Sequence, residues 1–216
     1  DEYINGYVIP GFQNAHSHAF QYAMSGLAEI HNYQSRKDDF WAWRYAMYRV
    51  ALSVNPEQLE SIATMLYVEM LRNGYTSVAE FHYLHHDDKG LPYTNMSELG
   101  ERLISAAKTA GIHITLIPIF YQKGGFGQPA EAYQRRFLSK DVDDYFRLLE
   151  DSIKSIRHYE NAQIGFGIHS LRAADQVSME RIFKEGPADR PIHLHLAEQL
   201  KEVDDCINYH GERPAQ

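Results

Sequence analysis

The chain has 216 residues, of which 44% are hydrophobic and 23% are charged, a composition typical of a globular protein with a substantial core. Its formal net charge of −8 argues against general nucleic-acid binding, which needs a basic face, and no apolar run is long enough to span a bilayer. The single cysteine, Cys206, excludes an internal disulfide framework and indicates a reducing, cytoplasmic environment.

Strand-like and helix-like segments alternate along the chain. Five largely continuous apolar runs predict buried strands at residues 7–12, 76–83, 113–121, 163–170 and 191–198. Helical spacing of apolar residues predicts helices at residues 55–73, 97–110, 143–158, 178–184 and 199–209. In the first of these helices, Asn55 is a suitable N-cap, Pro56 suits the first helical position, and Gly74 suits the C-terminal end.

This alternation predicts an α/β fold with a parallel sheet. A doubly wound sheet and a (β/α)8 barrel both fit the pattern, although five units are too few to close an eight-stranded barrel. In either architecture, the loops after the strand C-termini build the functional site. Long insertions follow the first and third predicted strands, at residues 13–55 and 122–142.

Histidines gather at the ends of the predicted strands. His16 and His18 follow the first strand, and His169 ends the fourth. Because residues i and i+2 of an extended chain point the same way, His16 and His18 can direct two imidazoles at one point. Neutral imidazole is a good ligand for Zn, Fe, Ni or Cu. Two core histidines or a solvated loop would give the same pattern, so this pair alone does not show whether a metal is bound.

A second pattern, His195 followed by Glu198, lies at the end of the fifth predicted strand. A catalytic zinc site uses about three protein ligands and a water, and needs a carboxylate that is not a ligand to move the water's proton. His195 as a ligand and Glu198 as a proton shuttle would meet these needs. Alternatively, Glu198 caps the following helix and His195 packs inside the fold.

Other histidines are expected to be structural. His193 shares a face with His195, and we expect it to fill the interior one layer below the metal. His85 and His86 could hold a second metal together with Asp87, but a polar loop is the simpler expectation. Cys206 is expected to pack in the last helix.

Together, the two patterns resemble the amidohydrolase superfamily in its aminohydrolase branch. The opening motif of that branch is similar to PGFQNAHSHAFQYAMSGLAE. The family of N-formimidoyl-L-glutamate deiminases, enzymes of histidine breakdown, resembles this chain over nearly its whole length, in the stretches FWAWRYAMYR, GYTSVAEFHYLHHD, GIHSLRA and HLHLAEQLKEVDDC.

The resemblance implies a (β/α)8 TIM-type barrel of the metal-dependent hydrolase kind, of which residues 1–216 would form about the first five β/α units. The family's small β-sandwich and last barrel units would lie outside this sequence. The family's metal-binding aspartate on strand eight and its assisting histidine on strand six would lie there too, so we expect this chain alone to lack full activity.

The resemblance also implies one zinc per chain, held by His16, His18 and His195, although Fe²⁺ or another divalent metal would fit, and Glu198 as the catalytic proton shuttle. The expected reaction is the hydrolytic deamination of N-formimidoyl-L-glutamate to N-formyl-L-glutamate and ammonia. The residues that would contact this small dicarboxylate are Gln21, Arg44, Tyr83, His169 and Arg172. Arginine suits such a substrate because its charge is permanent and its donors are forked.

Three alternatives remain open. A guanine- or cytosine-type aminohydrolase would share the metal site and Glu198, but would not need Arg44 and Arg172 for two carboxylates. An imidazolonepropionase fits the FWAWR and HSLRA stretches less well. The chain could also be a truncated metal-binding module without activity. No nucleic-acid or membrane partner is expected, and a homodimer is possible.

Overall fold

The computed structural model describes residues 5–27 and 40–216. In these residues, six strands form one sheet, and helices alternate with the strands as the sequence predicts. The strands are β1 (Phe12–Ser17), β2 (Tyr75–His82), β3 (His113–Phe120), β4 (Ala162–Ile164), β5 (Phe166–Ser170) and β6 (Ile192–His195). The α-helices are α1 (Phe40–Ser53), α2 (Pro56–Arg72), α3 (Glu98–Ala110), α4 (Val142–Ser155), α5 (Gln176–Glu185) and α6 (Leu200–His210). Short 3-10 helices are η1 (Ala19–Met24), η2 (Ala132–Gln134) and η3 (Ile156–His158).

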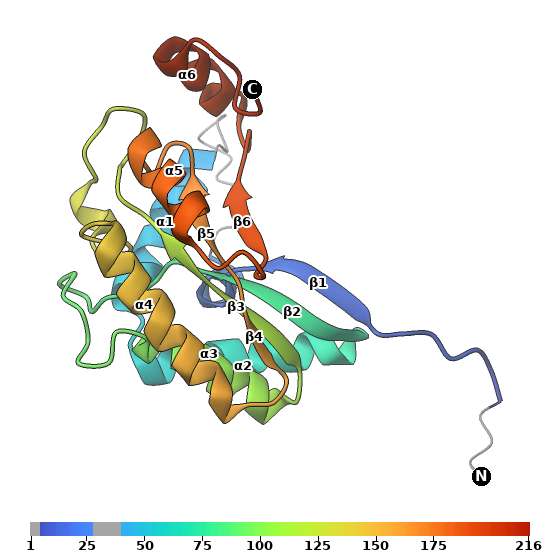
Figure 1. The fold of residues 1–216 in the computed structure, drawn as a ribbon. Coiled ribbons are helices and arrows are strands. Elements are labelled where there is room, and N and C mark those ends of the chain that lie inside the picture. Colours follow the sequence, from blue (N-terminus) through green and yellow to red (C-terminus); the bar gives the residue numbers. More distant parts are fainter. Residues whose placement is uncertain (1–4, 28–39) are drawn as a thin grey trace.

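The strands pair in the order β1–β2–β3–β5–β6, and β4 also pairs with β3. Every pairing is parallel, so the carboxyl ends of the strands meet at one end of the sheet. Figure 1 shows the strands side by side, with α2, α3 and α4 packed along one side of the sheet. The order follows the chain without reversal, which excludes the doubly wound alternative. The architecture is therefore a parallel half-barrel of five strand positions, because β4 and β5 together replace the one strand predicted at 163–170.

The first strand does not lie where the sequence predicted it. Residues 7–12 were expected to be a buried strand, but β1 begins only at Phe12, which pairs with Tyr75 at the start of β2. The apolar side chains of Tyr7, Val8 and Ile9 are exposed, because no strand in the described part of the chain lies beside them. His16 consequently lies inside the strand rather than after it.

The helices agree with the predictions to within a few residues, with one addition. Asn55 caps α2 in a reciprocal capping box with Gln58, as its side-chain oxygen accepts from the Gln58 backbone N–H at 2.8 Å. Helix α1 was not predicted, because it lies within the long insertion that follows β1. The buried side chain of Arg136 holds the C-terminal end of α1 by donating to the carbonyl oxygens of Ala51 and Val54.

Strands β5 and β6 approach each other closely at Gly167. A Cβ atom at this position would lie 1.9 Å from the carbonyl oxygen of His193, so only glycine allows this pairing. The pairing sets the position of His195, the last residue of β6, at the carboxyl end of the sheet.

The core lies between the sheet and the helices that cover it. Its largest fully buried apolar side chains include Leu59 and Tyr67 of α2, Leu103 of α3, Phe120 of β3 and Tyr145 of α4. Cys206 of α6 is buried, in agreement with the packing role predicted for it. No helix in residues 5–27 and 40–216 combines the length and the apolar character needed to cross a membrane.

Candidate metal centre and substrate pocket

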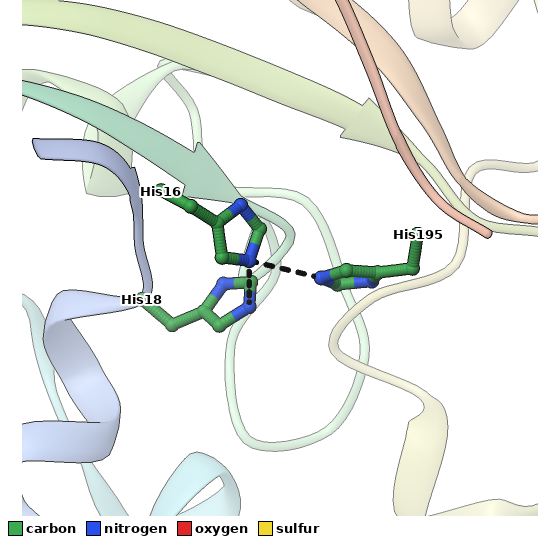
Figure 2. A group of neighbouring side chains, drawn as sticks. All are labelled: His16, His18 and His195. Atoms are coloured by element: carbon green, nitrogen blue, oxygen red, sulfur yellow. Dashed lines mark hydrogen bonds between the residues drawn. The ribbon is translucent and has the colours of Figure 1, made fainter. Parts of the chain in front are cut away.

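Three histidines converge at the carboxyl end of the sheet (Figure 2). His16 lies in β1, His18 follows that strand directly, and His195 ends β6. The Nε2 atom of His16 lies 3.1 Å from Nε2 of His18 and 3.1 Å from Nε2 of His195. The potential ligand atoms of all three lie within 4.8 Å of one another. The two-residue spacing in β1 thus directs both imidazoles to one point, as predicted.

The hydrogen-bond partner of His18 determines which of its two ring nitrogens is protonated and which has a lone pair for a metal. His18 Nδ1 lies 2.9 Å from the carbonyl oxygen of Phe81, which can only accept, so Nδ1 carries the hydrogen. Nε2 of the neutral ring is then a lone pair directed at the other two histidines. A backbone carbonyl that holds the second nitrogen of a ligand in this way is typical of metal-binding histidines.

The electrostatic environment keeps the three rings neutral. Burial lowers the pKa of His16, lowers that of His18 to about 3 and lowers that of His195 to about 4. Neutral imidazole is the form that binds a metal ion. Within the described residues, this is the only group of three or more histidine, cysteine or acidic side chains with metal-ligand spacing. The donor set fits a divalent transition metal such as zinc.

A buried acid that the sequence did not single out supports the chain directly after His18. Glu80 of β2 is 2% exposed, and its Oε1 accepts from the backbone N–H of Ala19 at 2.5 Å. Its other oxygen accepts from the Tyr67 hydroxyl at 3.1 Å. Burial raises the pKa of Glu80 to about 7. Glu80 is the only acidic residue of β2 and lies two positions before His82, which is the signal that could have identified it.

A pocket adjoins the histidine triad. Eight of the nine predicted site residues line it. The ninth, His16, is not in the lining but contacts His18 and His195, which are. The predicted residues in its lining are His18, Gln21, Arg44, Tyr83, His169, Arg172, His195 and Glu198. Five further residues complete the lining: Trp43, Met47, Tyr48, Tyr121 and Phe137.

The sequence analysis missed these five residues, although two carried a usable signal. Tyr48 lies one helical turn after Arg44, and Tyr121 directly follows β3, at the strand end where site residues are expected. Trp43 and Met47 come from α1, whose existence was not predicted.

One wall of the pocket next to the triad is aromatic. Gln21 donates from Nε2 to the hydroxyl of Tyr83 at 2.9 Å, and the Tyr83 ring packs edge-on against His18 and His169. The His169 ring lies 4.8 Å from that of His195, centroid to centroid. Burial lowers the pKa of His169 well below its usual value, so this ring is neutral near the triad.

Two arginines bring positive charge to the same pocket. Arg44 donates from Nε to the Tyr48 hydroxyl at 2.7 Å, and its guanidinium carbon lies 5.4 Å from the centre of the Tyr48 ring. Arg172 donates to Oε2 of Glu198 at 2.7 Å, and its Nε lies 3.6 Å from Oε2 of Glu202.

The carboxylate of Glu198 faces the pocket rather than the helix that follows it. Helix α6 begins after Gln199, and Glu202 of its first turn accepts from the backbone N–H of Glu198 at 3.0 Å. The side chain of Glu198 instead reaches Arg172 and remains 34% exposed. The alternative in which Glu198 caps α6 is therefore wrong.

The other histidines near the strand ends have different surroundings. His85 and His86 are buried, and their Nε2 atoms lie 2.9 Å and 2.7 Å from the backbone carbonyl oxygens of Ile119 and Leu138. They lie in the polar loop after β2, as expected, although their side chains are buried. The second metal site considered for them is not among the possible metal-binding groups of the described residues. His193 lies outside the triad and is partly buried.

Comparison with known proteins places this geometry in a family. The amidohydrolase family model matches residues 7–215. A curated formimidoylglutamate deiminase from Pseudomonas aeruginosa is 46% identical over all of this chain, which covers 47% of that protein. A crystal structure of an amidohydrolase from Brucella melitensis matches with a TM-score of 0.89 and 48% identity, over 95% of this chain and 45% of that one.

More distant structures share the fold. A zinc-bound adenosine deaminase from Xanthomonas campestris has a TM-score of 0.70 at 21% identity, over 95% of this chain and 40% of that one. The chain spans about half the length of the curated relatives it matches. The half-barrel is thus part of an amidohydrolase barrel, and the chain belongs to the amidohydrolase family.

Proposed function

We propose that the natural gene product containing this chain hydrolyses N-formimidoyl-L-glutamate to N-formyl-L-glutamate and ammonia, with zinc as its resident metal. The observation that carries this proposal is a single pocket that joins a metal-binding triad, a carboxylate and two guanidinium groups. The relative from Pseudomonas aeruginosa, named a formimidoylglutamate deiminase, supports the choice of substrate.

His16, His18 and His195 would hold the zinc through their Nε2 atoms. When bound, zinc supplies a Lewis acid that polarises the reacting group and lowers the pKa of a water to about 7. The contribution of this chain is to present three neutral imidazoles whose orientation is fixed by the sheet and, for His18, by the Phe81 carbonyl.

Glu198 is the proposed proton carrier. As the water oxygen bonds to the formimidoyl carbon, a carboxylate oxygen of Glu198 takes one proton from the water. Glu198 gives that proton to the terminal nitrogen and then carries the second proton of the former water, now on the hydroxyl group, to the same nitrogen. The bond between this nitrogen and carbon breaks, so that ammonia leaves and the C–O bond becomes the C=O of the formyl group. Arg172 donates to Oε2 of Glu198 and holds the carboxylate in the pocket.

The two arginines are the proposed anchors for the substrate carboxylates. Arg44 and Arg172 line the same pocket, as a dicarboxylate requires. Gln21, Tyr83 and the neutral His169 would surround the reacting group beside the triad. A guanine or cytosine carries no carboxylate, so a purine or pyrimidine aminohydrolase would leave both guanidinium groups without a partner in the substrate. This disfavours that alternative.

The test is ammonia release from N-formimidoyl-L-glutamate by the natural gene product supplied with zinc. Glu198→Gln should retain one equivalent of zinc and lose roughly 100- to 10,000-fold in kcat, because it removes the proton carrier but leaves the ligands in place. Glu150→Gln, which changes an exposed acid on α4, is the matched control and should behave as wild type.

Two outcomes would contradict the proposal. Wild-type protein with zinc bound and no ammonia release would remove the substrate assignment, and a panel of aromatic amines would then be tested. Normal turnover by Glu198→Gln would remove the proton-carrier assignment alone.

A further inference from the structure

A fully buried amide side chain lies behind the pocket and contacts two of its tyrosines. Gln134 belongs to η2, in the connection between β3 and α4, and is 0% exposed. Its Nε2 lies 2.7 Å from the hydroxyl oxygen of Tyr121 and 3.2 Å from that of Tyr48. Both tyrosines line the pocket.

The orientation of this amide follows from its other contact. Oε1 of Gln134 lies 2.7 Å from the backbone nitrogen of Glu131, which can only donate. The oxygen must therefore face Glu131, and the NH₂ group must face the two phenols. Gln134 is thus a donor to both Tyr48 and Tyr121.

This orientation determines what the Tyr48 hydroxyl can still do. Its oxygen accepts from Gln134 and, at 2.7 Å, also from Nε of Arg44. A phenolic oxygen accepts through two lone pairs and donates one hydrogen. With both lone pairs engaged, the hydroxyl hydrogen is what Tyr48 has left to offer. The neighbouring hydroxyl of Tyr121 hydrogen-bonds with Tyr48, but a carboxylate bound by Arg44 is charged and is therefore the stronger acceptor for this hydrogen.

We propose that Tyr48 donates its hydroxyl hydrogen to the substrate carboxylate bound by Arg44, and that Gln134 is the positioning residue that sets this direction. The inference rests on the proposed function, since it assigns a second donor to one carboxylate of the same substrate. It also makes the subsite selective for groups that only accept hydrogen bonds, as a carboxylate does. An amide presented there would place its NH₂ group against a hydroxyl hydrogen and a guanidinium.

The direct test is Gln134→Glu. The new side chain has the same shape and still offers an oxygen to the Glu131 N–H, but its second oxygen accepts where the amide donated. Tyr48 would then turn its hydrogen toward that oxygen and away from the substrate. We expect KM for N-formimidoyl-L-glutamate to rise roughly tenfold or more while kcat changes less than about threefold, because a ground-state contact to a charged group is lost.

A double-mutant cycle separates this effect from a general loss of structure. In the Tyr48→Phe background there is no hydroxyl to reorient, so Gln134→Glu should change KM by less than about twofold. An equal rise in KM in both backgrounds would overturn the proposal, as would a Gln134→Glu protein with unchanged KM. If Gln134→Glu does not fold, Gln134→Met takes its place in the same cycle, because it removes the donor without adding charge.

Binding of glutarate, a dicarboxylate without a formimidoyl group, gives a second measurement that needs no catalysis. Calorimetry on the wild type, the two single variants and the double variant should show the same pattern in Kd as in KM. A wild type that binds glutarate with this pattern but releases no ammonia would overturn the proposed function and leave this inference standing. A pattern in which the two substitutions act independently would overturn the inference alone.

Discussion

Two groups of histidines lie near the carboxyl end of the sheet, and their ring nitrogens have different partners. His85 and His86 direct Nε2 at backbone carbonyl oxygens, at 2.9 Å and 2.7 Å. His16, His18 and His195 direct Nε2 at one another, with two separations of 3.1 Å. The partner of the ring nitrogen, rather than the number or spacing of histidines, therefore separates the candidate metal centre from histidines that stabilise the fold.

The largest expected difference between the two groups is in metal binding. We expect His16→Ala and His195→Ala to reduce bound zinc to well below one equivalent, and to lower kcat/KM by about a thousandfold or more, since the Lewis acid supplies several kcal/mol. His86→Gln is the matched control, because glutamine can still donate to the Leu138 carbonyl, and it should retain the metal. Metal analysis after dialysis, together with ammonia release, measures both effects.

The comparison fails if the two groups respond alike. Loss of zinc from His86→Gln to the same extent as from His16→Ala would mean that both groups act on the metal. Full zinc content in His195→Ala would remove that residue from the centre.

A smaller effect on the metal is expected from substitution of Glu80, the buried acid that supports the chain directly after His18. Glu80→Ala removes the acceptor for the Ala19 N–H and should weaken zinc affinity about 10- to 100-fold, as loss of a supporting contact around a metal typically does. Glu80→Gln retains a carbonyl oxygen for that N–H and should bind zinc more tightly than Glu80→Ala. Competition with a chelator measures both affinities, and wild-type affinity in Glu80→Ala would contradict the supporting role.

The structural histidines should instead affect stability. His85→Leu leaves the Ile119 carbonyl without its imidazole donor and should lower the free energy of unfolding by about 1–3 kcal/mol. Zinc affinity of the folded protein should be unchanged. Urea titration with a parallel zinc titration checks both, and a variant with wild-type stability and weakened zinc binding would reverse the assignment.

The sequence predicted the parts of the site that depend on local spacing. His16 and His18 converge because a strand places alternate residues on one face, and β1 and β6 end beside each other because all strands are parallel. Eight predicted residues line one pocket, although Gln21, Arg44, Tyr83, His169 and Arg172 were identified only through the family resemblance.

The parts that the sequence did not predict depend on long-range contacts. The β1 strand is largely polar, with the sequence FQNAHS, so an apolar pattern placed it too early, in the exposed residues 7–11. The sequence does not show which residues Glu80 and Gln134 contact, because only the tertiary structure brings them to Ala19 and Tyr48. The periodicity of helices and strands gives no information about such contacts between distant residues.

Histidines of both groups should make unfolding depend on pH, and His85 gives the cleanest measurement because it lies outside the candidate metal centre. Burial lowers its pKa to about 3, against about 6.5 in the unfolded chain, so between these values the unfolded state binds a proton that the native state excludes. The contribution of neutral His85 to the free energy of unfolding is therefore fully present above pH 6.5. It is lost as the pH falls toward 3, by up to about 1.4 kcal/mol per pH unit.

His85→Gln can still donate to the Ile119 carbonyl but does not titrate. In metal-free protein its stability, relative to wild type, should improve by about 1.4 kcal/mol between pH 7.5 and pH 5.5, because the other histidines titrate equally in both proteins. Urea midpoints at the two pH values measure this, and parallel pH profiles for the two proteins would show that His85 binds its proton as readily in the native state as in the unfolded one.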